Sequence, residues 1–168
     1  METTANIEIA IARESDLDGV LQLQATNQIA NGGMLSASFS RSKLEMMMKD
    51  MPLLVARRAR SVVGFLICST TEMVGDIPIV LAMLDSYPTR ASDSYVYGPV
   101  CIAVEERGRG LAQLLFEELR RLLPGREGVL FIRRDNEASI RSHRKMGMNE
   151  VARFSYGGME HVVLSYVG

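Results

Sequence analysis

The chain has no tryptophan and little cysteine, histidine or proline: of its 168 residues, two are Cys, two are His and five are Pro. Two cysteines cannot build a disulfide-rich scaffold, and four scattered Cys and His residues match no zinc-ligand spacing. The longest apolar stretch, Ile77 to Leu84, is interrupted by Pro78 and is far shorter than the roughly 20 residues that span a bilayer. We therefore expect neither a metal site nor a membrane-spanning segment.

The chain also lacks an excess of either charge. It carries 19 Lys and Arg against 20 Asp and Glu, a formal net charge of −1, which argues against a nucleic-acid partner. Residues 105 to 145 nevertheless hold ten Lys and Arg against seven Asp and Glu. This local excess of positive charge permits an anion site without a general polyanion-binding surface.

What remains is the composition of a globular domain. With 47% hydrophobic residues over this length, residues 1 to 168 are expected to form one compact domain. Met1 to Thr4 show no basic start followed by an apolar run, which predicts no secretory signal. Cys68 and Cys101 both lie in apolar runs, as buried, reduced thiols of a cytoplasmic protein do.

Hydrophobic periodicity predicts the elements of the first half. They are a strand at Ile7 to Ala12, a helix from Ser15 ended by Asn31-Gly32-Gly33, a helix at Ser42 to Asp50, and a hairpin of strands at Leu53 to Arg57 and Val62 to Thr70. The segment from Glu72 to Asp93 is the least readable, because Ile79 to Leu84 fits either a buried helical turn or an extra strand.

The second half is more regular. The expected elements are a strand at Tyr95 to Val104, an amphipathic helix carrying leucines from Leu111 to Leu123, a strand at Val129 to Ile132, a helix from Asn136 to Gly147, and a hairpin of Met148 to Tyr156 with His161 to Val167. Gly98-Pro99 predicts a local break in strand pairing. The order β α α β β β α β α β β predicts an α/β fold, a mixed sheet with helices packed on it.

The most informative stretch is Arg107-Gly108-Arg109-Gly110-Leu111-Ala112, which lies between a buried strand and an amphipathic helix. Glycines let the backbone turn sharply and leave its amides uncovered, while the helix N-terminus adds roughly half a positive charge. Such a turn predicts an anion site, and phosphate is its natural occupant.

Three phosphate-binding patterns compete for this turn. A Walker loop needs Gly-Lys followed by Ser or Thr, but here the chain continues as Gly110-Leu111-Ala112. A dinucleotide fingerprint needs a small residue where Gln113 stands. The pattern that fits is Arg-x-x-Gly-x-Ala, formed by Arg107, Gly110 and Ala112.

This pattern resembles the pyrophosphate loop of the GNAT superfamily of acyl-CoA N-acetyltransferases. That loop has Gln or Arg, two variable positions, Gly, one variable position, then Gly or Ala. A second block resembles the family's later helix and consists of Asn136, Ser139, Ile140, His143, Lys145, Met146, Gly147 and Met148. The resemblance covers about residues 53 to 167, and it is weakest from 72 to 93.

The resemblance implies where acetyl-CoA binds. The strands ending at Val104 and Ile132 would diverge, and the pantetheine arm would lie in the gap as a pseudo-strand. The implied cofactor contacts are the backbone of Ile102, Ala103 and Val104 with the pantetheine, the amides of Gly108, Arg109, Gly110, Leu111 and Ala112 with the pyrophosphate, side-chain charge from Arg107 or Arg109, and the stripe of Asn136, Ser139 and His143.

One position departs from the commonest family pattern. Many members have a Tyr near the thiol of the cofactor, where it protonates the departing thiolate, and this chain has His143 there. The phosphinothricin-acetyltransferase-like group is similar in this respect. With a reference pKa near 6.5, a protonated imidazole is able to donate that proton. We therefore expect His143 to be catalytic.

These patterns predict an N-acetyltransferase that moves an acetyl group from acetyl-CoA to a primary amine of a small molecule or peptide by direct attack. An acyl-CoA-binding regulatory module without turnover and a protein-interaction domain are the alternatives. Cys101 has no visible basic partner for a covalent route. Four residues are candidates for the general base: Glu72, Asp85, Asp93 and Tyr97. The acceptor and the oligomeric state, a homodimer included, cannot be read from the sequence.

Overall fold

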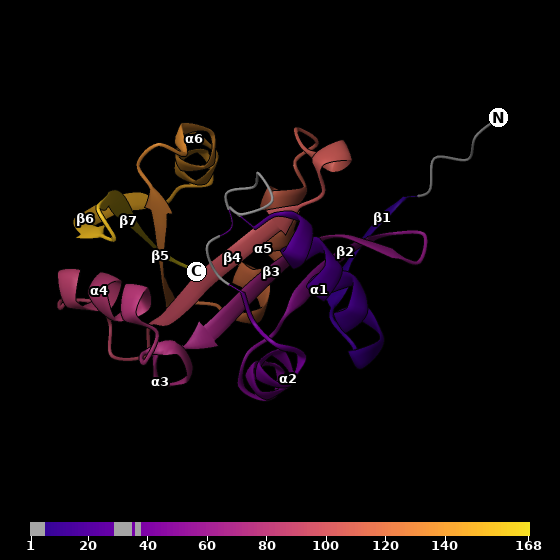
Figure 1. Ribbon diagram of the computed structural model, residues 1–168, viewed down its shortest axis with the longest axis horizontal. Helices are drawn as coiled ribbons and strands as arrows, with labels where there is room; N and C mark the ends of the chain where they lie inside the picture. Colours follow the sequence, from indigo (N-terminus) through magenta and orange to yellow (C-terminus); the bar gives the residue numbers. More distant parts are fainter. Residues whose placement is uncertain (1–5, 29–34, 36–37) are drawn as a thin grey trace. The chain divides into compact units, whose positions relative to one another are not determined.

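The computed structural model describes residues 6–28, 35 and 38–168. The fold is of the mixed α/β type, as predicted, and its described part contains seven β-strands and six α-helices (Figure 1). The chain divides into two compact units, Met1–Cys68 with Gly98–Leu122, and Ser69–Tyr97 with Leu123–Gly168. The expectation of a single domain over residues 1 to 168 stays a prediction.

The first unit contains β1 (Ile7–Ile11), β2 (Leu54–Arg58), β3 (Ser61–Thr70) and the end of β4 (Tyr95–Ile102), in the order β1-β2-β3-β4. β1 and β3 pair antiparallel with β2, and the predicted hairpin of β2 and β3 is confirmed. The amide of Ala103 donates to the Val63 carbonyl at 2.8 Å, so the end of β4 is fixed against β3.

Three helices belong to this unit: α1 (Leu17–Thr26), α2 (Arg41–Asp50) and α5 (Leu111–Leu122). The apolar face of α5 is buried and contacts β1 and β2, as the spacing of its leucines predicted. In the view of Figure 1, α1 lies in front of the strands of this unit and α5 lies behind them. The sheet of this unit is therefore covered on both faces.

Helix α1 ends earlier than the sequence predicted. It stops at Thr26, and Asn27 follows as its C-terminal cap. The side-chain amide of Asn27 donates to the carbonyl of Leu23 at 2.8 Å and so satisfies one of the last helical acceptors. The predicted stop at Asn31-Gly32-Gly33 lies outside the described residues.

The second unit contains the start of β4, β5 (Glu127–Arg133), β7 (Met159–Val167) and β6 (Asn149–Tyr156), in the order β4-β5-β7-β6. β5 and β6 both pair antiparallel with β7, so the predicted closing hairpin is confirmed. β4 and β5 are parallel and pair through two residue pairs, Tyr95 with Gly128 and Val96 with Val129. The predicted divergence of these strands involves both units and stays a prediction.

The segment that the sequence left open is helical. α3 (Thr71–Val74) and α4 (Pro78–Ser86) follow β3, and Pro78 is the first residue of α4, where its missing amide costs nothing. α4 contacts β6. The chain after α4 is tied to β5 through the buried Glu127 carboxylate, which accepts from the Tyr87 hydroxyl at 2.8 Å, the Ala91 amide at 2.7 Å and the Ser165 hydroxyl.

The remaining elements flank the predicted functional segments. β4 ends at Ile102, two residues before the predicted end, because Val104–Glu106 forms a turn of 3₁₀-helix. In the second unit, α6 (Glu137–Lys145) begins after Asn136, whose side chain accepts from the amide of Ser139.

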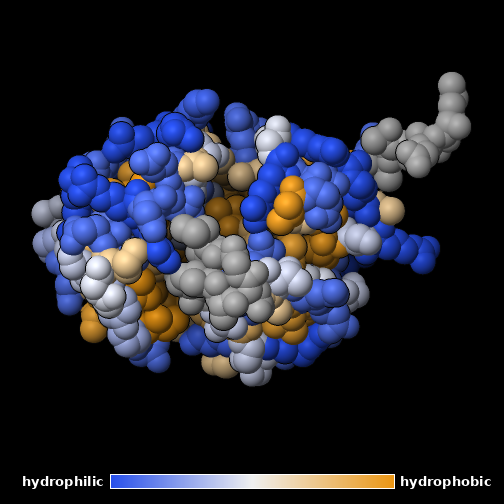
Figure 2. Space-filling model, turned by 45° about the horizontal axis from the view of Figure 1, so that its top comes forward, coloured by the Kyte–Doolittle hydropathy of each residue, from blue (hydrophilic) through white to orange (hydrophobic). Residues whose placement is uncertain are grey.

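Polar residues cover most of the face shown in Figure 2, and apolar residues form separate areas. Along the described ranges, no helix has the length and apolarity needed to cross a bilayer.

Candidate active site

The predicted anion-binding turn lies in the first unit, between the end of β4 and the start of α5. Gly108 and Gly110 both have a φ of 77°, a conformation that side-chain-bearing residues rarely adopt. Apart from its neighbours in the chain, a Cβ atom built on either glycine would find no atom of a described residue within 4 Å. The backbone of this turn is therefore sharply bent and open on the side that a ligand would approach.

The amides of the turn are available to an anion. The first α5 hydrogen bond runs from the Leu114 amide to the Gly110 carbonyl at 3.1 Å, which makes Gly110 the N-terminal cap. The amides of residues 108 to 113 donate no hydrogen bond to another residue that the structure describes. Together with the positive end of the α5 dipole, these donors suit a phosphate or pyrophosphate group.

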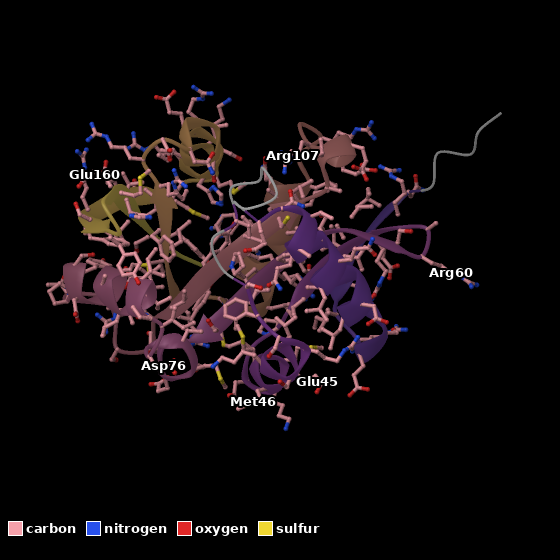
Figure 3. The ribbon with its side chains drawn as sticks, viewed as in Figure 1. Glu45, Met46, Arg60, Asp76, Arg107 and Glu160 are labelled. Carbon is pink, nitrogen blue, oxygen red and sulfur yellow. The ribbon has the colours of Figure 1, made fainter. Side chains whose placement is uncertain are left out.

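The two arginines of the turn differ in their engagement. Arg107, labelled in Figure 3, donates from Nε to the Ile102 carbonyl at 3.2 Å and from Nη2 to Asn27 Oδ1 at 2.7 Å. The Arg109 side chain is 58% exposed and makes a longer contact with Glu106, 3.4 Å. The charge of Arg109 is thus less engaged in contacts within the protein than the charge of Arg107.

The backbone just before the turn is already partly bonded within the first unit. The Ala103 amide donates to Val63, and the Ala103 carbonyl accepts from Glu106 at 2.9 Å. The Ile102 carbonyl accepts from Arg107, and the Val104 carbonyl accepts from the Arg107 amide at 3.3 Å. The predicted pairing of these residues with pantetheine stays a prediction.

The buried carboxylate of Glu106 anchors the segment that directly precedes the turn. Glu106 accepts two hydrogen bonds from Arg58 of β2, at 2.7 and 2.9 Å. The Arg58 guanidinium lowers the pKa of Glu106, so this carboxyl group is ionised at neutral pH. Sequence analysis missed this pair, because nothing in the β2 sequence marks Arg58 as a partner for the residue before the motif.

The second predicted block lies in the second unit and contains a buried hydrogen-bonded chain. The Asn136 side chain caps α6 by accepting from the Ser139 amide, and Ser139 lies one turn before His143. His143 is only 3% exposed. Its Nδ1 lies 2.7 Å from the Ser139 carbonyl, and its Nε2 lies 3.1 Å from the Tyr97 hydroxyl. The predicted stripe is therefore a connected unit.

These contacts define the tautomer of His143. A carbonyl oxygen only accepts, so Nδ1 carries the hydrogen that is donated to Ser139. Burial lowers the pKa of His143, which keeps the ring neutral at pH 7 and leaves Nε2 as an acceptor. The hydroxyl of Tyr97 then donates to Nε2. A resting imidazolium, which direct proton donation by His143 requires, is disfavoured by this burial.

Aromatic packing fixes Tyr97 in the second unit. Its ring meets His143 edge to face at 5.5 Å between centroids and meets Tyr166 in the same way at 5.9 Å. Tyr166 in turn lies over β5, where a Cβ atom on Gly128 would come within 2.4 Å of the Tyr166 ring. Burial raises the pKa of Tyr97, so its hydroxyl stays protonated.

The other reactive side chains are less suited to chemistry. Burial raises the pKa of the Cys101 thiol to about 11, which leaves little thiolate at neutral pH. Cys68 is likewise a buried free thiol. His161 is buried and stacked on Phe154, at 4.9 Å between centroids. The part of the chain that the structure covers holds no group of three or more side chains placed to bind a metal.

Family comparison agrees with the geometry of the turn. Residues 24–148 match the model of the acetyltransferase (GNAT) family, which is most of the chain. The chain belongs to the GNAT acetyltransferase family. The enzyme class predicted from the two motifs is therefore confirmed. No curated protein sequence is significantly similar to this GNAT chain.

Solved structures share the fold. An N-acetyltransferase from Staphylococcus aureus Mu50 has a TM-score of 0.72 and 17% identity, with 97% of this chain and 99% of that chain covered. The ribosomal-protein-S18-alanine N-acetyltransferase from Escherichia coli has a TM-score of 0.68 and 12% identity, with 96% and 94% covered. At these identities the likeness supports the fold alone.

A third structure bears on the predicted subgroup. A GNAT superfamily phosphinothricin acetyltransferase from Sinorhizobium meliloti, solved in complex with acetyl-CoA, has a TM-score of 0.69 and 16% identity, with 96% of this chain and 88% of that chain covered. Its identity to this chain lies in the same low range as that of the other two. The expectation of a phosphinothricin-acetyltransferase-like variant around His143 stays a prediction.

Proposed function

We propose that this GNAT protein transfers the acetyl group of acetyl-CoA to a primary amine of a small molecule or peptide by direct attack. The observation that carries the proposal is the turn from Arg107 to Ala112, where two glycines with positive φ precede α5 and its first amides have no acceptor in the part of the chain that the structure describes. The amides from Gly108 to Ala112 bind the pyrophosphate, and Arg109 adds charge beside them.

The turn fits this ligand on grounds independent of the family. A pyrophosphate needs several converging N–H donors and a positive field, and both exist at the start of α5. Open space at Gly108 and Gly110 lets a bulky anion reach the backbone. Bound acetyl-CoA supplies the activated acetyl group. The residues named above hold it, and the backbone of Ile102, Ala103 and Val104 lies next to the same turn.

The second unit supplies a proton route. We propose that Tyr97 and His143, whose hydroxyl oxygen and Nε2 lie 3.1 Å apart, handle the proton of the reaction. The attacking amine would lose one proton to this pair, and the departing thiolate would gain one from it, so that no charge is left over.

Asn136 and Ser139 support this route. Asn136 caps α6, and the Ser139 carbonyl holds the Nδ1 hydrogen of His143. Their contact with acetyl-CoA remains part of the proposal. Catalysis would rest mostly on positioning, as expected for two substrates that are held in one orientation.

The placement of the enzyme is also proposed. Residues 1 to 168 would act as a single acyltransferase domain. Cys68 and Cys101 are free thiols, which is the state that a reducing cytoplasm maintains.

Two measurements test the function in sequence. Isothermal titration of the full chain with CoA is expected to give saturable binding, and a lack of heat at millimolar CoA would contradict the turn assignment and favour a protein-interaction domain. Acetyl-CoA consumption is then followed with a thiol reagent across amino acids, polyamines, aminoglycosides and peptide N-termini. Binding without amine-dependent thiol release would instead indicate a regulatory module.

A further inference from the structure

Asn27 connects helix α1 to the turn proposed to bind pyrophosphate. Its side-chain oxygen accepts from Arg107 Nη2 at 2.7 Å, while its side-chain amide donates to the Leu23 carbonyl at 2.8 Å. Arg107 also donates from Nε to the Ile102 carbonyl. Asn27 is buried, so its position is set by α1. The guanidinium is therefore anchored at two points, one on β4 and one on the end of α1.

The same residue holds part of the chain that connects α1 to α2. The carbonyl of Asn27 accepts from the Leu35 amide at 3.0 Å, and Gln28 and Leu35 form an isolated bridge. One helical turn earlier, the buried side chain of Gln24 pairs with the backbone of Phe39 in both directions, at 2.9 Å each. The last turn of α1 thus fastens Leu35, Phe39 and Arg107 at once.

We infer that Asn27 is a positioning residue that couples CoA binding at the turn to the order of the chain at Leu35 and Phe39. The inference rests on the CoA site proposed above. Arg107 directly precedes Gly108. Its hydrogen bonds to Asn27 and Ile102 therefore restrict the conformations of the turn before a ligand binds. A restricted turn loses less conformational freedom on binding.

Thermodynamic linkage gives the reverse effect. If the contact between Arg107 and Asn27 favours binding of CoA, then bound CoA favours the contact by the same factor. The end of α1 is then held more firmly, and with it the hydrogen bonds that Asn27 and Gln24 make to Leu35 and Phe39. Cofactor occupancy is in this way transmitted to the segment between α1 and α2.

A purely structural role for Asn27 makes a different prediction. The Thr26 hydroxyl donates to the same Leu23 carbonyl, at 3.1 Å, and accepts from the Asn27 side-chain amide at 3.3 Å, and among the described residues it has no hydrogen bond to Arg107. Thr26→Ala therefore removes a comparable helix-end hydrogen bond and serves as the matched control.

The first test is calorimetric titration of the full chain with CoA. Asn27→Ala is expected to weaken CoA affinity about fivefold, the net effect of one hydrogen bond, whereas Thr26→Ala stays within about twofold of the wild type. In an Arg107→Ala background, Asn27→Ala should cause no further loss. Equal losses with and without Arg107, or equal losses in Asn27→Ala and Thr26→Ala, would overturn the inference.

The second test is hydrogen exchange of the Leu35 and Phe39 amides, with and without saturating CoA. In the wild type, CoA should slow both amides, and in Asn27→Ala the response of Leu35 to CoA should vanish. A wild type that binds CoA with unchanged exchange at Leu35 refutes the coupling and leaves the proposed function intact. A wild type that does not bind CoA refutes the proposed function first.

Discussion

The turn before α5 and the block around His143 are built on opposite principles. In the turn, two glycines face open space and the helix amides have no acceptor among the described residues. In the block, His143 is 3% exposed and both ring nitrogens have partners. The turn works by leaving donors free, so added bulk or charge should harm it. The block works by satisfying every donor, so removal of a partner should harm it.

The largest effect is expected from filling the turn. Gly110→Glu places a side chain where φ is 77° and a negative charge where phosphate would lie. Strain and repulsion together should reduce affinity for CoA at least about 100-fold. Calorimetric titration with CoA measures this loss.

The matched control is Gly158→Glu in the β6–β7 turn. Gly158 has a φ of 76° and equally open surroundings. The same substitution there should leave CoA affinity within about twofold of the wild type. It causes a similar backbone strain, but no phosphate is proposed to bind at that turn. An equal loss in both variants would mean that strain, and not the anion site, explains the effect.

The next effect comes from removing a partner in the buried block. His143→Ala deprives the Tyr97 hydroxyl of its acceptor and should slow the single-turnover rate of acetyl transfer about 100-fold, with CoA affinity nearly unchanged. Rapid-quench measurement at saturating acetyl-CoA separates the two quantities.

Tyr97→Phe is the companion variant, because it keeps the ring packed on His143 and Tyr166 and removes only the hydroxyl. It should be slowed to a similar extent. If Tyr97→Phe turns over at the wild-type rate, the proposed proton route is refuted, even where His143→Ala is slow for reasons of packing.

A third prediction concerns the packing that supports Tyr97. Gly128→Ala would bring a Cβ atom within 2.4 Å of the Tyr166 ring, and the displaced ring should lower the free energy of unfolding by about 1–3 kcal/mol. Urea denaturation measures the change. Tyr166→Leu should offset part of the loss in the double variant. Additive losses would show that Tyr166 is not the residue displaced.

The smallest effect is the pH dependence of stability. Because burial lowers the pKa of His143 below its ordinary value of 6.5, the unfolded chain takes up a proton at higher pH than the folded chain does. Stability should therefore fall as pH decreases through about 6.5 and level off below the lowered folded pKa. His143→Gln should flatten this slope by up to about 1 kcal/mol between pH 7.5 and 5.5.

The pH dependence of stability should also be measured for His161→Gln, as a comparison with His143→Gln. Burial also lowers the pKa of His161, so its contribution has the same sign. The two single variants should each remove part of the slope, and the double variant should remove both parts. A wild-type slope in His143→Gln would contradict the buried, neutral state of this ring.

The turn could be predicted from the sequence because its chemistry is local. Gly108 and Gly110 are needed for their backbone angles, and Arg107 to Ala112 are contiguous, so a short pattern contains the whole geometry. The strands and α5 could also be predicted, because the spacing of their apolar residues reflects one buried face.

The contacts that the sequence did not predict are made between distant residues. Arg58 reaches Glu106, and Asn27 reaches Arg107, over 48 and 80 positions of the chain. The Nε2 atom of His143 has its partner in Tyr97, 46 residues earlier. The spacing of Asn136, Ser139 and His143 indicated that they share a face of the helix, but not that His143 is buried. The end of α1 was misplaced because Asn27, and not a glycine, caps it.

The Glu127 carboxylate concentrates the anchoring of one long connection in a single side chain. This residue of β5 accepts from Tyr87, from the Ala91 backbone and from Ser165, and so holds the return from the helices α3 and α4. Loss of this one carboxylate would therefore release the chain before β4 from both β5 and β7, which makes the connection between β3 and β4 robust at every position except one.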